Sequence, residues 1–320
     1  MNQQNVLVAE HLKKIYGPRL AVRDLSFSLR SGRILGFLGP NGAGKTTSIR
    51  MLTTIMEPDG GQFSVAGIPD TKPEQIRRVI GVLPESFGLP KQMTGIEYLT
   101  FFGQLYGRSS REAREYGLQL LDEVGLAHRG KSLVGSYSHG MRQRIGIARA
   151  LVNDPSVMFL DEPTLGLDPK GQQELNQLVK RIARERNAAI ILCSHMLPEV
   201  EAVCDDVVIL SSGEVVVQGP VGDVTGKAER NVIRVRVPVP AVADAQRELE
   251  ALTPVKRVVA GTAQPGWLRL EVDGTAVEGN HLSNRILDAL IRAGIPIQGF
   301  EPQGGRLQDV FLDLTTKALK

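Results

Sequence analysis

The stretch Gly39-Pro40-Asn41-Gly42-Ala43-Gly44-Lys45-Thr46-Thr47 decides how the chain is organised. An apolar run at 34–38 precedes it, and apolar residues at helical spacing follow from Ile49, which predicts a loop between a buried strand and a helix. Glycines let backbone N–H groups turn around a polyphosphate, Lys45 would reach the terminal phosphates, and Thr46 would bind Mg²⁺. The stretch therefore predicts a nucleotide-binding loop. A glycine-rich turn that binds nothing is the weaker alternative.

Length and composition limit the class of protein. The 320 residues exceed one typical domain, so we expect a large domain and a smaller appendage. Apolar residues make up 42% and charged residues 23%, which argues against extended disorder. The net charge is only +3 and the basic residues are scattered among acidic ones, so we expect no direct nucleic-acid partner.

Cysteine usage and hydropathy indicate a protein of the cytosol. Cys193 and Cys204 have no partners at metal-site spacing, and we interpret both as packing residues. The first ten residues lack the basic and apolar segments of a signal peptide, and no apolar run reaches about 18 residues. Any membrane role is expected to come through another polypeptide.

Residues 6–30 are predicted to form short antiparallel strands, because Leu25, Phe27 and Leu29 alternate with polar residues. Within this region Tyr16 lies in a turn-like sequence. Two interpretations are open for Tyr16: its ring stacks on an adenine base, or it is a half-buried surface tyrosine.

A mostly helical insertion is predicted over residues 88–150. A buried strand at Ile80–Leu83 comes before it, with Glu85 shortly after the strand. Capping boxes that begin at Thr94 and Ser109 predict two helices, since each capping box comes just before an apolar run.

Two continuous apolar runs, Val157–Leu160 and Ala189–Cys193, are predicted to be central parallel strands. Asp161 and Glu162 follow the first run and His195 follows the second, so we expect all three at the carboxyl ends of strands, where open α/β sheets bind ligands. An amphipathic helix separates the two runs, which predicts a parallel sheet with helices on both faces.

The character of the sequence changes from Gly226 onward. Strands are predicted at 232–237, 255–260, 267–272 and 295–300, and helices at 241–252 and 280–293. The order βαββαβ is that of a ferredoxin-like α+β domain.

Four features occur in the order found in ATP-binding cassette (ABC) ATPases, which the chain resembles over residues 1 to about 220. They are the phosphate loop, Tyr137-Ser138-His139-Gly140-Met141, Leu160-Asp161-Glu162 with Leu165-Gly166-Leu167-Asp168 after it, and His195. The resemblance implies an α/β P-loop NTPase domain at 1–225, with a mixed sheet and a helical subdomain at about 88–150. An accessory domain at 226–320 would follow, and the activity would be hydrolysis of ATP with Mg²⁺.

The resemblance also implies roles for individual residues. The implied metal ligands are Thr46, Glu85 and Asp161, and the implied catalytic residues are Lys45, Glu162 and His195. Further nucleotide contacts are expected from Tyr16, Gly39, Pro40, Asn41, Gly42, Ala43, Gly44, Thr47, Ser138, Gly140 and Asp168. Glu162 would be the general base, and His195 would contact the γ-phosphate. Asp168 would communicate across a dimer, which is compatible with its being a helix N-cap before a proline.

The sequence departs from the family pattern in two places. The usual Leu-Ser-Gly-Gly-Gln signature is here 137–141, which keeps Ser138 and Gly140. The role of His139 stays open, since it would either touch the nucleotide or cover the loop. Glu85 stands where many members carry a glutamine that senses Mg²⁺ and the transport partner, and a carboxylate can still ligate Mg²⁺.

Partners follow from the resemblance as well. In this family the signature faces ATP held by the other subunit, so we expect a homodimer with two composite sites. The segment Leu307–Thr315 resembles the closing segment of exporter ATPases whose membrane partners are of the ABC-2 class. We therefore expect separate ABC-2 type permease subunits and a position at the cytoplasmic face of the cell membrane. The C-terminal domain would stabilise the dimer, regulate it, or be a passive extension.

Two other functions compete with transport. One is a soluble ABC ATPase acting on ribosomes or nucleic acid, which is disfavoured because the chain has one cassette and only short helices between phosphate loop and signature. The other is a nucleotide-binding regulator without turnover, which the presence of both Glu162 and His195 disfavours.

Overall fold

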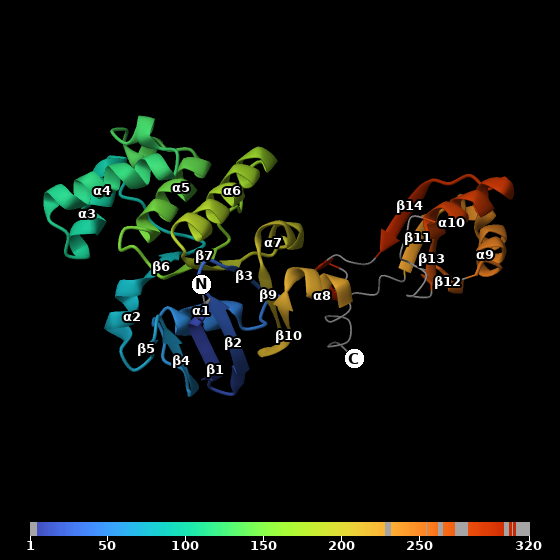
Figure 1. The fold of residues 1–320 in the computed structure, drawn as a ribbon, viewed down its shortest axis with the longest axis horizontal. Coiled ribbons are helices and arrows are strands. Elements are labelled where there is room, and N and C mark those ends of the chain that lie inside the picture. The colour runs from blue at the N-terminus through green and yellow to red at the C-terminus, as the bar shows by residue number, and fades with distance from the viewer. Residues whose placement is uncertain are drawn as a thin grey trace. The chain divides into compact units, whose positions relative to one another are not determined.

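The computed structural model describes residues 5–227, 232–253, 255–261, 265–272, 281–303, 307–308 and 310–311. These residues form two compact units that divide between Val221 and Gly222 (Figure 1). Each unit has its own sheet, with ten strands in the first and four in the second among the described residues.

The sheet of the first unit has the strand order β5-β4-β1-β2-β10-β9-β3-β8-β7-β6. Its strands are β1 (Asn5–Tyr16), β2 (Arg19–Arg30), β3 (Ile34–Leu38), β4 (Gly60–Val65), β5 (Ile68–Pro69), β6 (Ile80–Leu83), β7 (Val157–Asp161), β8 (Ala189–Cys193), β9 (Asp206–Ser211) and β10 (Glu214–Pro220). Its helices are α1 (Lys45–Leu52), α2 (Pro73–Val79), α3 (Gly95–Leu105), α4 (Ser110–Glu123), α5 (His139–Ala150), α6 (Pro169–Glu185) and α7 (Leu197–Val203), and α8 (Val221–Lys227) lies at the division.

Four neighbouring strands, β3, β8, β7 and β6, run parallel to one another. Every residue of β3 and β8 is buried, as the continuous apolar runs predict for strands with both faces covered. Because the four strands are parallel, their carboxyl ends meet at one edge of the sheet. The segments that follow them in the chain begin at that edge.

The antiparallel part of this sheet also follows its sequence pattern. β1 pairs with β2 and β4 in antiparallel register, so the alternating residues Leu25, Phe27 and Leu29 face the core while their neighbours are more exposed. The expectation of antiparallel strands at 6–30 is confirmed. Both free cysteines are buried, as packing residues would be.

The helical insertion is confirmed. Thr94 and Ser109 are the N-caps of α3 and α4, and both capping boxes have the two reciprocal hydrogen bonds of that motif. Figure 1 shows α3, α4 and α5 (green) grouped at one side of the first unit, with β1, β2 and β4 (blue) at the other. The unit is thus the mixed sheet with a helical subdomain that the sequence predicts.

The second unit has the element order βαββαβ, as predicted. Its elements are β11 (Val232–Arg236), a short 3₁₀ helix η3 (Val239–Ala241), α9 (Val242–Glu250), β12 (Val255–Ala260), β13 (Trp267–Val272), α10 (His281–Arg292) and β14 (Gly299–Gln303). The antiparallel sheet order β12-β13-β11-β14 puts the first and third strands in the centre, as in ferredoxin-like domains.

The prediction of the last strand at 295–300 is wrong in its bounds. β14 begins at Gly299 because its partner β11 ends at Arg236, and Gly299 is the residue opposite Arg236. The buried Ile295 belongs instead to the connection after α10, where it packs in the core of this unit. Much of the predicted closing segment Leu307–Thr315 lies outside the described residues.

Candidate active site

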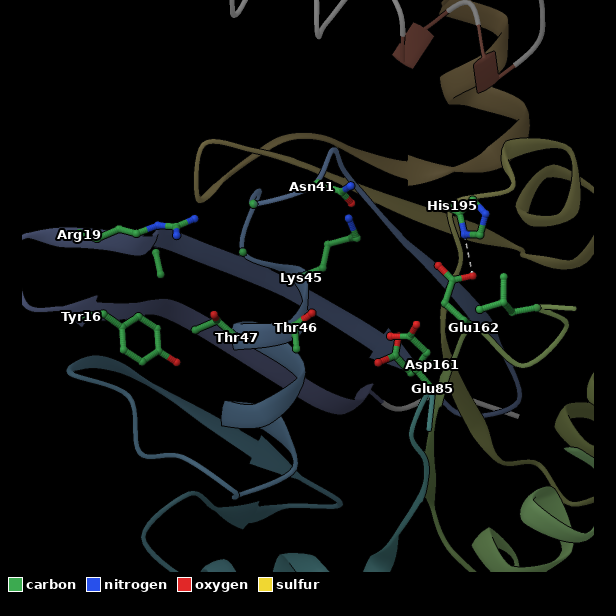
Figure 2. A pocket seen from close by; sticks show the side chains of 14 residues that line it. Tyr16, Arg19, Asn41, Lys45, Thr46, Thr47, Glu85, Asp161, Glu162 and His195 are labelled. Atoms are coloured by element: carbon green, nitrogen blue, oxygen red, sulfur yellow. Dashed lines mark ion pairs between the residues drawn. The ribbon is translucent and has the colours of Figure 1, made fainter. Parts of the chain in front are cut away.

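A cavity of about 630 Å³ lies at the carboxyl edge of the parallel strands. It is lined by Tyr16, Arg19, Ala21, Asn41, Gly42, Gly44, Lys45, Thr46, Thr47, Glu85, Asp161, Glu162, Leu165 and His195. Figure 2 shows Tyr16 and Arg19 at one end of this pocket and Glu162 and His195 toward the other. Residues from all four strand ends therefore meet in one place, as the parallel topology requires.

The glycine-rich loop wraps one side of the pocket. Gly42 and Gly44 have φ angles of 83° and 103°, a region that residues with a Cβ rarely adopt. A Cβ on Gly44 would also lie 2.7 Å from the carbonyl oxygen of Ala21. The next residue, Lys45, begins α1, so the loop presents backbone N–H groups and a helix N-terminus to the pocket. This cradle fits a polyphosphate.

The ammonium group of Lys45 is held over the loop. Its Nζ donates hydrogen bonds to the carbonyl oxygens of Gly39 and Pro40, at 2.5 and 3.0 Å. Burial lowers the pKa of Lys45, while Glu162 and Asp161 act in the opposite sense. An anionic phosphate near the ammonium would favour its charged form further.

Negative charge gathers where β6 and β7 end. Burial, together with the neighbouring carboxylates Glu162 and Glu85, raises the pKa of Asp161 to about 6, and Lys45 opposes this only in part. Thr46, Glu85 and Asp161 all line this pocket, and Figure 2 shows the carboxylates of Glu85 and Asp161 beside each other. A divalent cation here would relieve the repulsion among the carboxylates.

This donor set fits Mg²⁺ that enters with a nucleotide. Among the residues that the structure describes, no three His, Cys, Asp or Glu side chains are arranged to hold a metal ion by themselves. Mg²⁺ takes few protein ligands and completes its shell with water and substrate phosphate oxygens. The hydroxyl of Thr46 and the carboxylates of Asp161 and Glu85, beside a phosphate cradle, match this preference of Mg²⁺.

Glu162 and His195 form a contact between adjacent strands. Nδ1 of His195 lies 2.9 Å from Oε2 of Glu162, and the side chain of Glu162 is only 16% exposed. The backbone N–H of Glu162 donates to the carbonyl oxygen of Cys193 at 2.9 Å, and its φ is 49°, so the residue is held in an uncommon conformation. Because a carboxylate accepts here, Nδ1 carries a hydrogen in this contact.

The other end of the pocket is open. Tyr16, whose side chain comes from the end of β1, is 40% exposed and donates its hydroxyl hydrogen to the sulfur of Met56 at 3.0 Å. Its ring faces the pocket, which leaves the adenine-stacking interpretation available.

Three lining residues were not predicted from the sequence, namely Arg19, Ala21 and Leu165. The signal for Arg19 is its position opposite Tyr16 across a tight hairpin, because the two residues are paired in the β1–β2 register. Nothing in the sequence singles out the other two, which reach the pocket through tertiary packing.

The residues of the signature segment do not line this pocket, and neither does Asp168. Ser138 and Asp168 are N-caps, accepting hydrogen bonds from the backbone N–H of Met141 at 3.3 Å and of Gly171 at 3.1 Å. His139 contacts the carbonyl oxygen of Leu165 through Nε2 at 2.7 Å. The signature therefore touches the loop after β7, and the nucleotide contacts that the sequence predicts for Ser138 and Gly140 do not fall within this pocket.

Comparison with known sequences identifies relatives across nearly the whole chain. Residues 22–165 match the ABC transporter family. Linearmycin resistance ATP-binding protein LnrL of Bacillus subtilis (strain 168) is 32% identical over 98% of this chain and 100% of its own length. Daunorubicin/doxorubicin resistance ATP-binding protein DrrA of Streptomyces peucetius is 34% identical over 95% of this chain and 90% of its own length. Bacitracin transport ATP-binding protein BcrA of Bacillus licheniformis is 40% identical over 67% and 70%, respectively.

Solved structures agree with these relatives. An ATP-binding subunit of an ABC transporter has 32% sequence identity and a TM-score of 0.61, over 68% of this chain and 91% of that chain. The cbiO1 protein of Clostridium perfringens, part of the ABC transporter complex cbiONQ, has 26% identity and a TM-score of 0.64, over 70% and 92%. The chain therefore belongs to the ABC transporter family, as an ATP-binding subunit that hydrolyses ATP.

Proposed function

We propose that the chain powers export through separate membrane subunits of the ABC-2 type, with its chemistry at the carboxyl edge of the parallel strands. The observation that carries this proposal is the meeting of the phosphate cradle with Asp161, Glu162 and His195 in one pocket. Binding alone needs only the cradle. A buried carboxylate in contact with a histidine beside that cradle is suited to turnover.

The loop and Lys45 would orient the triphosphate. Backbone N–H groups of Asn41, Gly42 and Gly44, which line the pocket, would contact its oxygens. The Lys45 ammonium would move from the loop carbonyls toward the terminal phosphates. Mg²⁺, when bound by Thr46 and Asp161 with help from Glu85, would neutralise charge on the phosphates. Tyr16 would support the adenine ring at the open end of the pocket.

Glu162 would accept a proton from the attacking water, and His195 would contact the γ-phosphate. The 2.9 Å contact between them fixes the carboxylate against the imidazole. A general base must lie within hydrogen-bond reach of its water, so holding the carboxylate in one orientation favours the reaction.

A second copy of the chain would complete the site. The signature and Asp168 are outside the pocket, and the start of α5 is free to present Ser138 and backbone N–H groups to a nucleotide held by another chain. This supports a homodimer with two composite sites.

The membrane partner and the cargo are inferred from the relatives. Within the described parts of the chain, we find no helix with both the length and the apolar character needed to cross a bilayer. The names of LnrL, DrrA and BcrA refer to resistance to, or transport of, antibiotics. We infer a peripheral subunit at the cytoplasmic face of the membrane that drives export of an organic molecule which the permease selects.

A pull-down tests the partner. Tagged Glu162→Gln protein with ATP and Mg²⁺ should trap the nucleotide-bound state, and a polytopic membrane protein should co-purify from solubilised membranes. The matched control is the same variant with EDTA and no ATP. Recovery of ribosomes or nucleic acid with no membrane protein would overturn the transporter proposal.

A further inference from the structure

A buried polar pair, Ser194 and Glu199, begins at the residue before His195 and lies outside the pocket. The hydroxyl of Ser194 donates a hydrogen bond to Oε2 of Glu199 at 2.7 Å, and the two residues are only 1% and 7% exposed. Ser194 follows the last residue of β8, and Glu199 is in the first turn of α7. Neither residue lines the nucleotide cavity.

Ser194 and Glu199 lie on either side of His195 in the chain, and His195 is the residue that lines the pocket. Besides donating to Glu199, the Ser194 hydroxyl accepts a hydrogen bond from the backbone N–H of Met196 at 3.1 Å. The hydroxyl therefore joins the backbone on the far side of His195 to the side chain of Glu199. The side chain of His195 is 62% exposed, so little packing covers its ring. The position of the ring therefore depends on the backbone turn, which the Ser194 hydroxyl holds, and on the contact with Glu162.

The same turn is tied to the catalytic carboxylate. The N–H of Glu162 donates to the carbonyl oxygen of Cys193, the residue immediately before Ser194. Nδ1 of His195 contacts the carboxylate of Glu162 on the other side. The ends of β7 and β8 are thus linked by one backbone hydrogen bond and one side-chain contact. The Ser194–Glu199 pair holds the turn that follows β8.

The carboxylate of Glu199 is poorly suited to a purely stabilising role. Its second oxygen, Oε1, is buried and has no hydrogen-bond partner among the described residues. A buried polar atom without a partner lowers stability, and this is most marked for a group that can carry charge. An apolar residue at position 199 would avoid this loss of stability. We therefore interpret the hydrogen bond from Ser194 to Glu199 as serving the neighbouring site.

We propose that Glu199 is a positioning residue for hydrolysis, which acts through the Ser194 hydroxyl to hold His195 in contact with Glu162. The inference rests on the proposed roles of His195 and Glu162. Glu199 itself touches neither nucleotide nor metal. What it supplies is a hydrogen-bond acceptor, and its negative charge is not required.

Steady-state ATP hydrolysis by purified full-length variants tests this, with the ATP Kd and the melting temperature measured on the same samples. Glu199→Ala and Ser194→Ala each remove the bond, and Glu199→Gln keeps an acceptor oxygen for the hydroxyl. The exposed Glu185→Ala, at the end of α6, is the matched control for loss of a glutamate.

We expect kcat of Glu199→Ala to fall about tenfold, since small displacements of catalytic groups have effects of this order, while KM and the ATP Kd change less than about twofold. Glu199→Gln should keep kcat near that of the parent, and Glu185→Ala should not differ from it. The double variant lacking both partners should be no slower than either single alanine variant, because both remove the same bond.

Three results would overturn the inference. The first is a folded Glu199→Ala with parental kcat, the second is Glu199→Gln as impaired as Glu199→Ala, and the third is additive losses in the double variant. If Glu199→Ala does not fold, Ser194→Ala decides the matter by the same criteria. The His195→Ala variant separates the two proposals. Parental kcat in His195→Ala contradicts the proposed role of His195. A strong loss of kcat in His195→Ala, with no loss of kcat in Glu199→Ala, contradicts only the positioning role of Glu199.

Discussion

The nucleotide pocket and the signature segment 137–141 lie in one chain but are built in different ways. The pocket draws its groups from the carboxyl ends of four neighbouring strands, and burial there shifts the pKa values of Lys45 and Asp161. The signature is the start of a single helix, whose Ser138 hydroxyl caps the helix and whose His139 contacts the carbonyl of Leu165.

The proposed homodimer accounts for this difference: one chain would supply most of a site, and a second chain would supply the signature. The phosphate cradle, the proposed metal ligands, the proposed base Glu162 and His195 line the pocket, whereas the start of α5, which would face the γ-phosphate, does not. We therefore expect substitutions in the pocket to change the properties of the single chain, such as its ATP binding or stability. Substitutions in the signature should change turnover by the dimer and leave ATP binding by the single chain unchanged.

The largest effect is expected from Glu162→Gln. Removing the proposed base should lower kcat roughly 10²- to 10⁴-fold, the range typical of general acid–base catalysis, because the amide cannot accept the proton of the attacking water. ATP affinity should remain within about threefold, since the phosphate cradle is unchanged. Hydrolysis and equilibrium binding of ATP should be measured on the same preparation. Parental kcat would rule out Glu162 as the base.

A smaller effect is expected from Ser138→Ala in the signature. Loss of a hydrogen bond to a charged phosphate should lower kcat about tenfold or more, while ATP binding to the isolated chain stays unchanged. Both this variant and its control, Ser109→Ala, lose a helix N-cap, which costs about 1 kcal/mol of stability. If the two variants had equal activity, the proposal that the signature contributes to the site would be contradicted.

Tyr16→Ala should affect binding more than turnover. Loss of stacking on a base is worth about 1–2 kcal/mol, so the Kd for ATP should rise roughly 5- to 30-fold with little change in kcat. Tyr16→Phe keeps the ring and should bind ATP normally, although it loses the hydrogen bond to Met56. The control is Tyr106→Ala, which removes a tyrosine of similar exposure. An unchanged Kd in Tyr16→Ala would leave Tyr16 as a surface residue.

The smallest effect concerns stability and pH. The pKa of Asp161 is raised from 3.8 to about 6, so this carboxyl favours folding when it is protonated, and its contribution is lost as the pH rises from about 4 through about 6. At pH 7.5 without Mg²⁺, Asp161→Asn should therefore raise the free energy of unfolding by about 1 kcal/mol, because solvent screening at this partly exposed carboxyl reduces the roughly 3 kcal/mol to which the whole pKa shift corresponds.

Urea unfolding in EDTA at pH 4.5 and 7.5 measures this. The stabilisation by Asp161→Asn should be largest at pH 7.5 and should shrink at pH 4.5. Asp122→Asn, on an exposed position of α4, is the control and should change little at either pH. An equal effect of Asp161→Asn at both pH values would contradict the repulsion among Asp161, Glu162 and Glu85.

The sequence predicts much of this fold because its signals are local. Apolar runs such as Ala189–Cys193, the capping boxes at Thr94 and Ser109, and the glycine loop each depend on residues close together in the chain. The order of the strands in the sheet depends on long-range pairing, and so does the arrival of Arg19 and Leu165 in the pocket. The start of β14 was misplaced for the same reason, because its partner strand decides it.

The site shows the same division. Motifs indicate which residue types are present, but the 2.9 Å contact of His195 with Glu162 and the buried bond between Ser194 and Glu199 arise only when β7, β8 and α7 pack together. No local pattern announces such contacts, since each joins segments whose spacing the fold sets.

The most direct test of the central claim is the specific ATPase activity measured over a wide range of protein concentration. If the pocket of one chain is completed by the signature of another, activity per chain should rise with concentration and then level off as dimers form. The concentration at half-maximal activity should match the dimer dissociation constant from sedimentation under the same conditions. A specific activity that stays constant down to nanomolar protein, where sedimentation shows monomers, would contradict the claim.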